Sequence, residues 1–382
     1  MPSIEQAFKW GMPIGRLLPL GLRSSAVAGL LLACSTLPHG APAAPAEQRG
    51  SELEQVLREA KARSGGARHA FVTVSWSYRA GAPLAAPAAL GADGGVVVGS
   101  VDGYLHALRP DGSFRWGYTL RGPLIGRAVV APNGEIFAAA EPNGLYALDP
   151  DGTLAWVSSI GGGVTSAPIL DREARVWVTT GQGTLLGFSG HGGIVGYARV
   201  GNERMLGPAA LAAGGVAIAS VNGALKVAGN RSFSARMVAA APVLELDSGP
   251  DALFVLGGEG LSRFDTPEGA ERWSRGDVAR IACSEPTLVV VDDRGLGWLS
   301  PRGELVAHVD LALGPHRPIA CLPDGELLVA DEAGNLVRLG QKGVRARAKL
   351  PDGRLLSLDP RSDGIVVAAY RDGRVLGLRL ID

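Results

Sequence analysis

Carboxylate side chains are the commonest groups in this sequence that could bind a metal, but their spacing does not assemble a site. A calcium site needs six or more oxygen ligands that converge on one point. The aspartates instead recur at turns, where an aspartate accepts hydrogen bonds from its own backbone; they include Asp102, Asp111, Asp151, Asp372 and the pair Asp292-Asp293. We therefore predict no metal site, no catalytic site and no bound cofactor.

The histidines and glycine runs also lack the patterns of known sites. His106 lies on an expected strand and His191 in a turn, while His308 and His316 bracket a loop. No pair has the helical spacing or the cysteine companion of a zinc site. There is no Gly-x-Ser-x-Gly nucleophile elbow, and Gly161–Gly163 precedes an expected strand rather than a helix. The sequence therefore gives no reason to assign an enzymatic activity.

The elements that must position these side chains are short strands that repeat about every 40 residues. Val96–Trp116 contains two hairpin turns, Asp-Gly and Pro-Asp-Gly, between short apolar or alternating segments. The glycine of the first turn recurs at spacings of 35–41 residues, at Gly103, Gly144, Gly183, Gly223, Gly260, Gly295, Gly334 and Gly373. A period near 40 built from strands is typical of a β-propeller. We predict an all-β, eight-bladed β-propeller of four-stranded antiparallel blades over residues 70–382.

The two ends of the repeat array predict how the ring closes. The eighth repeat stops at Leu376–Asp382, with no residues left for an outer strand. Phe71–Tyr78 stands before the first inner strand, and its Trp76 lies 40 residues before Trp116. We therefore predict that the N-terminal strand joins the last blade, which removes free sheet edges.

Large aromatic rings recur at one position of the outer strands. They are Trp76, Trp116, Trp156 and Trp273, with Tyr197 at the corresponding place in another repeat. Such a ring is best explained as a wedge between neighbouring sheets, where each buries about 150–250 Å². A row of rings that stack on a ligand is the alternative.

Cys283 and Cys321 could form a disulfide in an exported protein. They end matching segments, Ile281–Cys283 and Ile319–Cys321, one repeat apart. Equivalent positions of rotationally related blades point in the same tangential direction, whereas a disulfide needs Cβ atoms about 3.5–4.5 Å apart. We therefore expect two buried free thiols, with a disulfide as the alternative.

Residues 1–34 are typical of an export signal. Ala26–Ala33 is a compact apolar segment, too short for a membrane span of about 20 residues. The end of this segment and the next residue, Leu31-Leu32-Ala33-Cys34, resemble the lipobox of bacterial lipoproteins. We predict that Cys34 is lipidated and tethers the protein to a membrane. The alternative is a secretory signal cut near Ala41–Ala46, which would remove Cys34.

Residues 35–69 are expected to form a Pro/Ala-rich tether and a short helix. Residues 35–50 have no periodicity, and Ser51 followed by Glu54 is a capping-box pattern. The chain has 37 basic and 37 acidic residues, so a nucleic-acid partner is not expected. The basic run Lys342–Lys349 is expected to be a solvated strand face.

The repeat resembles the quinoprotein-type propeller repeat. An apolar strand is followed by Asp-Gly-Tyr-Leu-His-Ala-Leu at 102–108, then by Pro-Asp-Gly and by Arg-Trp at 115–116. Similar repeats occur in pyrroloquinoline quinone dehydrogenases and in the lipoprotein subunit of the outer-membrane β-barrel assembly machinery. The resemblance covers about residues 70–382 and is strongest in the first three repeats, which include Asn143–Asp149; repeats six to eight lack the outer tryptophan. Such a repeat specifies the fold better than the function.

The resemblance implies a non-enzymatic binding scaffold in the bacterial envelope. We expect a monomeric, periplasmic, outer-membrane-anchored propeller that contacts an envelope protein, possible partners including an outer-membrane assembly complex. A quinone-dependent dehydrogenase is one alternative, although relatives of that kind hold the cofactor over Ca²⁺ and many stack it on a disulfide between adjacent cysteines, a pair that this sequence lacks. A small-molecule or glycan sensor that uses the central channel is another.

Overall fold

The structure is a computed structural model that describes residues 71–381, apart from residue 143 and the segments 200–204, 212–213, 229–232, 238–241, 250–251, 266–270, 285–286 and 315–316. The predicted export signal with Cys34, the tether and the short helix lie outside the described residues. His316 also lies outside them. In the described part, no helix has the length and apolar character needed to cross a membrane.

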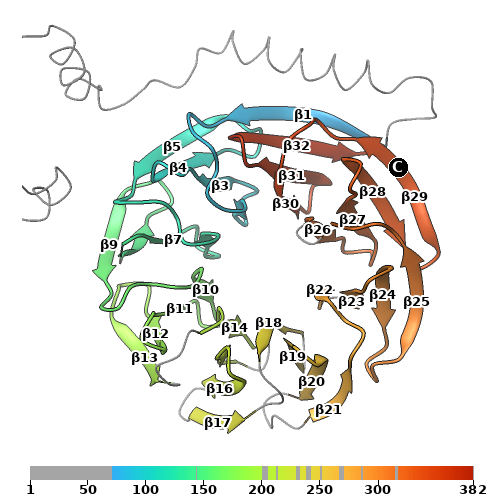
Figure 1. Cartoon of the computed structure of the whole chain (residues 1–382). Helices are drawn as coiled ribbons and strands as arrows, with labels where there is room; N and C mark the ends of the chain where they lie inside the picture. Colours follow the sequence, from blue (N-terminus) through green and yellow to red (C-terminus); the bar gives the residue numbers. More distant parts are fainter. Residues whose placement is uncertain are drawn as a thin grey trace, which may run out of the picture. The chain divides into compact units, whose positions relative to one another are not determined.

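The described residues form eight four-stranded antiparallel sheets, which Figure 1 shows arranged around a ring. We number these blades in chain order. Blades 1 to 4 consist of β2 (Ala89–Leu90), β3 (Val96–Gly99), β4 (Tyr104–Leu108) and β5 (Phe114–Thr119); β6 (Val129–Val130), β7 (Ile136–Ala140), β8 (Gly144–Leu148) and β9 (Leu154–Ser159); β10 (Ile169–Leu170), β11 (Val176–Thr179), β12 (Thr184–Phe188) and β13 (Ile194–Arg199); β14 (Ala209–Ala210), β15 (Val216–Ala219), β16 (Ala224–Ala228) and β17 (Phe233–Met237).

The second half of the ring has the same order of strands from the centre outwards, except at its end. Blades 5 to 8 consist of β18 (Val243–Ser248), β19 (Ala252–Gly257), β20 (Gly260–Asp265) and β21 (Glu271–Arg275); β22 (Arg280–Cys283), β23 (Leu288–Val291), β24 (Gly295–Leu299) and β25 (Leu305–Asp310); β26 (Ile319–Cys321), β27 (Leu327–Ala330), β28 (Asn335–Gly340) and β29 (Gly343–Lys349); β30 (Leu355–Pro360), β31 (Ile365–Tyr370), β32 (Arg374–Leu380) and β1 (Val72–Arg79).

The core lies in the seams between neighbouring blades. The second strand of a blade is an unbroken apolar run, such as Val96–Gly99, because both faces of the sheet are covered. One apolar cluster joins Leu105 of blade 1 to Ile136 of blade 2, and another joins Leu336 of blade 7 to Val366 of blade 8. Outer strands are more exposed, since the blades diverge towards the rim.

The predicted turn glycines all lie at the hairpin between the second and third strands of a blade. Gly373 shows why glycine is needed there. Its φ is 95°, and an added Cβ would lie 2.8 Å from the carbonyl oxygen of Ala82. Only glycine takes this conformation at little cost and leaves room for the neighbouring connection.

The predicted closure of the ring by the N-terminal strand is confirmed. β1 pairs antiparallel with β32, in a register that includes Val72 opposite Leu380 and Arg79 opposite Arg374. Figure 1 shows β1 at the rim, along the outer side of β32. Strands from the two ends of the described chain therefore share blade 8. The backbone of β1 is hydrogen-bonded to that of β32, so the outer edge of β32 is covered.

Candidate functional site

The four tryptophans predicted as wedges lie in the seams between blades. Each ring packs on a positive-φ glycine in the hairpin between the third and fourth strands of the next blade, where an added Cβ would overlap the ring. The pairs are Trp76 with Gly112, Trp116 with Gly152, Trp156 with Gly192 and Trp273 with Gly303. The repeated ring and the repeated turn therefore form one contact between blades.

A hydrogen bond completes three of these four contacts. The indole Nε1 donates to the carbonyl two residues before the glycine: Trp116 to Pro150 at 2.9 Å, Trp156 to Gly190 at 2.6 Å and Trp273 to Pro301 at 3.0 Å. At the closing seam, Arg361 instead donates to the carbonyl of Pro110. The Nε1 of Trp76 has no partner among the described residues, so the Trp76 ring itself contributes only packing to this seam.

Tyr197 differs from the prediction. Trp116 and Trp156 lie opposite Ala107 and Ala147, whereas the corresponding place in blade 3 is Gly196, opposite Gly187. The ring of Trp177 lies against both of those glycines. Tyr197 is one residue further along, and a shift of one residue turns a side chain to the other face of the sheet. Tyr197 is therefore not placed as a wedge and is 57% exposed.

Substitution of Gly152 by alanine is expected to destabilise the seam between blades 1 and 2 more than backbone strain alone would. Gly325 is a matched control, because its φ of 81° resembles the 90° of Gly152 but the space around it is open. Overpacking costs about 1–3 kcal/mol, so Gly152→Ala should lower the free energy of unfolding by that much more than Gly325→Ala. Equal urea midpoints for the two variants would contradict the wedge contact.

A buried network around His106 was not predicted from the sequence. Tyr78 of β1 contacts His106 Nδ1 through its hydroxyl at 2.9 Å, and His106 Nε2 lies 3.3 Å from Ser100 Oγ. Ser100 Oγ in turn donates to Asp102 Oδ1. A serine, a histidine and an aspartate therefore meet in a seam between blades 8 and 1.

The direction of the hydrogen bonds makes this network structural rather than nucleophilic. Because Ser100 Oγ donates its proton to the Asp102 carboxylate, it accepts from His106 Nε2, and we therefore assign the proton of neutral His106 to Nε2, which leaves Nδ1 to accept from the Tyr78 hydroxyl. A catalytic histidine would instead accept the serine proton. Ser100 is also fully buried, so a substrate could not reach it.

The stability of the protein is expected to fall with acid in a way that depends on His106. Burial lowers the pKa of His106 to about 4 against a weaker opposing effect of Asp102. The unfolded chain therefore takes up this proton first, near its usual pKa of about 6.5, and stability falls as the pH drops from there towards 4. Between pH 7 and pH 5 the loss from this group is about 2 kcal/mol.

Urea unfolding at the two pH values measures this effect. His106→Gln should lose about 2 kcal/mol less than the unmodified protein between pH 7 and pH 5. His191→Gln is the control, because His191 is exposed in a turn. If both variants keep the full pH dependence, His106 is not the group responsible.

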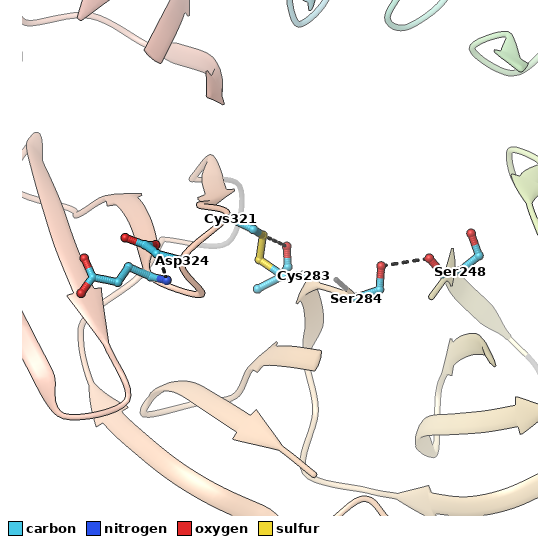
Figure 2. Close-up of a disulfide and its surroundings, with 7 residues drawn as sticks. Ser248, Cys283, Ser284, Cys321 and Asp324 are labelled. Carbon is cyan, nitrogen blue, oxygen red and sulfur yellow. Dashed lines mark hydrogen bonds between the residues drawn. A yellow bond between two sulfur atoms is a disulfide. The ribbon is translucent and has the colours of Figure 1, made fainter. Parts of the chain in front are cut away.

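The inner strands of blades 6 and 7 are joined by a disulfide, which corrects the expectation of free thiols. Cys283 and Cys321 are bonded, with their Cα atoms 6.2 Å apart. Figure 2 shows the bond between these neighbouring inner strands, with Ser284, just after β22, and Ser248, at the end of β18, on the side away from Cys321. Ser284 Oγ donates to the carbonyl of Ser248 at 3.1 Å, which ties blade 6 to blade 5.

A β-bulge explains why the two cysteines can meet. In β22 the register shifts between Ile281 and Cys283, whereas β26 pairs without a shift up to Cys321. Cys283 therefore lies opposite Val289, the second residue of β23, whereas Cys321 lies opposite Leu327, the first residue of β27. A bulge adds a residue and reverses the faces that follow, so the two positions are not rotationally equivalent.

Charged side chains also link the inner strands. Glu245 of blade 5 accepts a hydrogen bond from the Ile281 backbone at 2.9 Å, and burial raises the pKa of Glu245. Arg127 Nη2 lies 2.6 Å from Asp359 and so connects blade 2 to blade 8 across blade 1. Burial nevertheless raises the pKa of Asp359. These contacts hold neighbouring and next-neighbouring blades together.

The turn aspartates bond their own backbones, which confirms that interpretation. Asp111 and Asp151 each accept a hydrogen bond from the amide two residues later, at 2.9 and 3.0 Å. Asp292 does the same and also contacts His308 Nε2 at 2.9 Å, while His308 Nδ1 faces Asp310 at 3.1 Å. Among the described residues, no group of three or more histidine, cysteine or acidic side chains is arranged to hold a metal.

Exposed apolar side chains gather on the outer strands of blades 2 and 3. On β13, Ile194 is 65% exposed and Val195 50%, beside the exposed Tyr197. On β9, Leu154 and Val157 are also exposed. By contrast, β29 carries several charges, among them Arg345 and Arg347, which discourage strand pairing at an edge. On β25 of blade 6, Leu305 and Val306 are also exposed. We call β9 and β13 the apolar rim.

Residues 64–295 match the family described as outer membrane protein assembly factor BamB. The chain belongs to this BamB family. The matched residues include blades 1 to 5, with the apolar rim and three of the four tryptophan–glycine contacts described above. No curated protein sequence is similar enough to this chain to count as a match.

Solved structures with the same fold include a BamB protein. BamB from Moraxella catarrhalis is 18% identical, with a TM-score of 0.63 over 81% of this chain and 100% of that one. The computationally designed protein Ika8 is 13% identical, with a TM-score of 0.65 over 79% and 98%. The WD40 propeller domain of Doa1 is 14% identical, with a TM-score of 0.54 over 81% and 97%. At these identities, the likeness shows the fold alone.

Proposed function

We propose that this chain is a non-enzymatic scaffold of the bacterial envelope that takes part in outer-membrane protein assembly. Its membership of the BamB family is the observation that carries this proposal. A propeller whose blades are held by seams of buried side chains is a rigid platform, and its rim and loops remain available to partners. The chemistry of the described residues also favours a scaffold, since His106, Asp292 and Asp359 act in contacts within the fold.

The apolar rim is the surface we propose for the protein partner. β13 pairs only with β12 among the described strands, so one side of its backbone ladder is open. An extended segment of a partner can add to such an edge, with main-chain hydrogen bonds supplying affinity and exposed side chains supplying specificity. Ile194 and Val195 would contact that segment.

Export and lipid anchoring are part of the same proposal. A stable disulfide such as Cys283–Cys321 forms in oxidising compartments, which include the periplasm. The sequence around Cys34 supplies the lipidation motif. A propeller tethered in this way would reach partners at the inner surface of the outer membrane.

Affinity purification of the tagged full-length protein from mildly solubilised membranes, followed by mass spectrometry, tests the function. We expect an integral β-barrel assembly protein at near-stoichiometric yield. If the affinity resin is saturated with the tagged protein and the propeller is still recovered alone, the protein does not form a stable assembly complex. A Ca²⁺-dependent quinone chromophore in the purified protein would instead support a dehydrogenase.

Two charge substitutions on outer strands test the surface separately. Val195→Lys places a charge on the apolar rim, while Val344→Lys places one on β29, where the native valine is 40% exposed. Val195→Lys should reduce recovery of the partner about tenfold and Val344→Lys should leave it unchanged. If both variants recover the partner equally, the partner does not bind at the apolar rim. The proposal that the protein is an assembly scaffold would still stand.

A further inference from the structure

A row of exposed apolar and basic side chains lies along one edge of the ring, on blades 6 and 7. β25 and β29 are neighbours at the rim (Figure 1), and each is the fourth strand of a blade with the same strand order. They therefore run in the same direction and begin at the same edge of the ring. The exposed residues in the first part of these strands and in the hairpin before β29 include Leu305, Val306, Lys342, Val344, Arg345 and Arg347. We call these six residues the basic edge.

Two cations of the basic edge are not neutralised by the side chains around them. In the part of the chain that the structure describes, Lys342 and Arg347 form no ion pair. The other charges here balance. On blade 6 the exposed Arg302 is followed by the exposed Glu304, and Arg345 belongs to a neutral cluster that consists of Arg338, Arg345, Asp324 and Glu326. The edge as a whole is therefore positively charged.

The corresponding edge of blade 2 carries the opposite charge. The hairpin before β9 contains Asp149 and Asp151, next to the exposed Leu154 of the apolar rim. The hairpin before β29 contains Lys342 in their place. An anionic surface is therefore attracted to blade 7 and repelled from blade 2, although both blades expose apolar side chains.

The predicted membrane tether joins the propeller beside the basic edge. Phe71, the first described residue, is 7% exposed and packs in the apolar cluster between blades 7 and 8. Ala346 and Ala348 of β29 pack against the same cluster. A lipid anchor at Cys34 would therefore be connected to the ring next to the strand that carries the unpaired cations.

The tether alone does not fix which surface of the propeller meets the membrane. About 36 residues separate Cys34 from Phe71, and a flexible chain of that length has an average end-to-end distance of about 30–36 Å. The tether does keep the basic edge at a high effective concentration near lipid. Cations beside exposed apolar side chains suit an anionic phospholipid surface, because headgroups attract the charges and the interface buries the apolar groups.

We propose that the basic edge lies on the anionic phospholipid surface of the membrane that holds the anchor. Lys342 and Arg347 would contact lipid phosphates, and Val344 would enter the interface below the headgroups. β13 lies four blades from β29 in a ring of eight, so the apolar rim would point away from the membrane and stay open to a protein partner. This inference rests on the lipid anchoring proposed above and is independent of the assembly partner.

Quenching of a fluorescent label by lipids with spin-labelled headgroups tests this contact. The full-length protein is purified from membranes and reconstituted into vesicles of phosphatidylcholine, with or without about 30% phosphatidylglycerol. The label is attached at Val344→Cys on the basic edge or, as the control, at Val157→Cys on blade 2, since the two native valines are similarly exposed, at 40% and 44%. In anionic vesicles we expect at least about threefold more quenching at position 344 than at position 157. In neutral vesicles the two positions should be quenched equally.

Charge reversal tests the two cations directly. In the Val344→Cys protein, Lys342→Glu together with Arg347→Glu should reduce quenching to the level at position 157. Arg121→Glu together with Arg172→Glu makes the same change in net charge at exposed positions on other blades and should leave quenching unchanged. Salt at 1 M, where the Debye length is about 3 Å, should act like the first pair of substitutions.

Equal quenching at positions 344 and 157 in anionic vesicles would overturn the proposal. Excess quenching at position 344 that is the same in neutral vesicles would also overturn it, because the contact would not depend on lipid charge. If position 344 becomes shielded only when a membrane protein is added to the vesicles, the edge binds an acidic protein and not lipid. If intact mass shows no lipid on Cys34, the anchor proposal fails; the labelled proteins are then mixed with preformed anionic vesicles, where excess quenching at position 344 supports the basic edge and its absence overturns it.

Discussion

Deletion of residues 70–80 is expected to unfold blade 8, the blade farthest from them in the sequence. β1 is the fourth strand of that blade and covers the β32 edge over the whole register from Val72 to Arg79. It also carries Trp76, which packs on Gly112 and Gly377, and Tyr78, which contacts His106. Loss of one buried tryptophan side chain costs about 3–5 kcal/mol. Removal of the whole strand should therefore cost at least about 5 kcal/mol, comparable with the total stability of many domains.

Hydrogen exchange resolved by segment measures where this deletion acts. We expect β31 and β32 to lose protection first, while β7 and β8 of blade 2 keep theirs for longer. Deletion of residues 35–45, in the predicted tether, is the control of equal length. If the 70–80 deletion lowers protection only in blade 1, β1 does not close the ring through blade 8. Association of the deleted protein would be a further sign of an exposed β32 edge.

Loss of the Cys283–Cys321 disulfide is expected to destabilise the propeller by about 4 kcal/mol, the value for a closed loop of this length in the chain-entropy account. The bond spans 38 residues and fixes the inner strand of blade 6 to that of blade 7. Without it, the seam would depend on apolar contacts such as those of Val291 and Leu327. The double variant Cys283→Ala, Cys321→Ala removes the bond and leaves no buried free thiol.

Urea unfolding of the double variant, with and without a reductant, measures this contribution. The reductant should lower the midpoint of the unmodified protein and leave that of the double variant unchanged. Intact-mass alkylation of the unreduced, unfolded protein checks the bond directly, because neither Cys283 nor Cys321 should then react. Equal midpoints for the double variant and the unmodified protein would show that the bond adds nothing to stability.

Local patterns predicted the parts of the fold that depend on neighbours in the chain. The turn glycines, such as Gly103 and Gly373, mark hairpins because positive φ is a property of one residue and its turn. The ring closure was also predictable, since a strand was missing at one end and present at the other. The recurring tryptophans indicated seams between blades. Their partner, the hairpin glycine of the next blade, could have been found from the spacing of 36 residues between Trp116 and Gly152.

The candidate binding surfaces were less accessible to sequence reasoning. The apolar rim was hidden because Tyr197 looked like a wedge, and only the pairing of β12 with β13 shows that it faces outwards. The buried, unpaired hydroxyl of Tyr370 was not predictable either, because it depends on which residues of blades 7 and 8 lie side by side. No spacing along the chain marks Tyr370 as unpaired, since its hydroxyl belongs to a seam between segments far apart in sequence.

The sequence by itself determined the repeat, its strands and turns, and the strand that closes the ring, because these follow from periodicity and the conformations of single residues. The tertiary structure alone decided which side chains face one another between blades. A β-bulge in β22 turned Cys283 towards Cys321, and the approach of β1 to blade 1 placed Tyr78 on His106. Such contacts depend on one-residue shifts of register, and a one-residue shift reverses the face of every side chain that follows it.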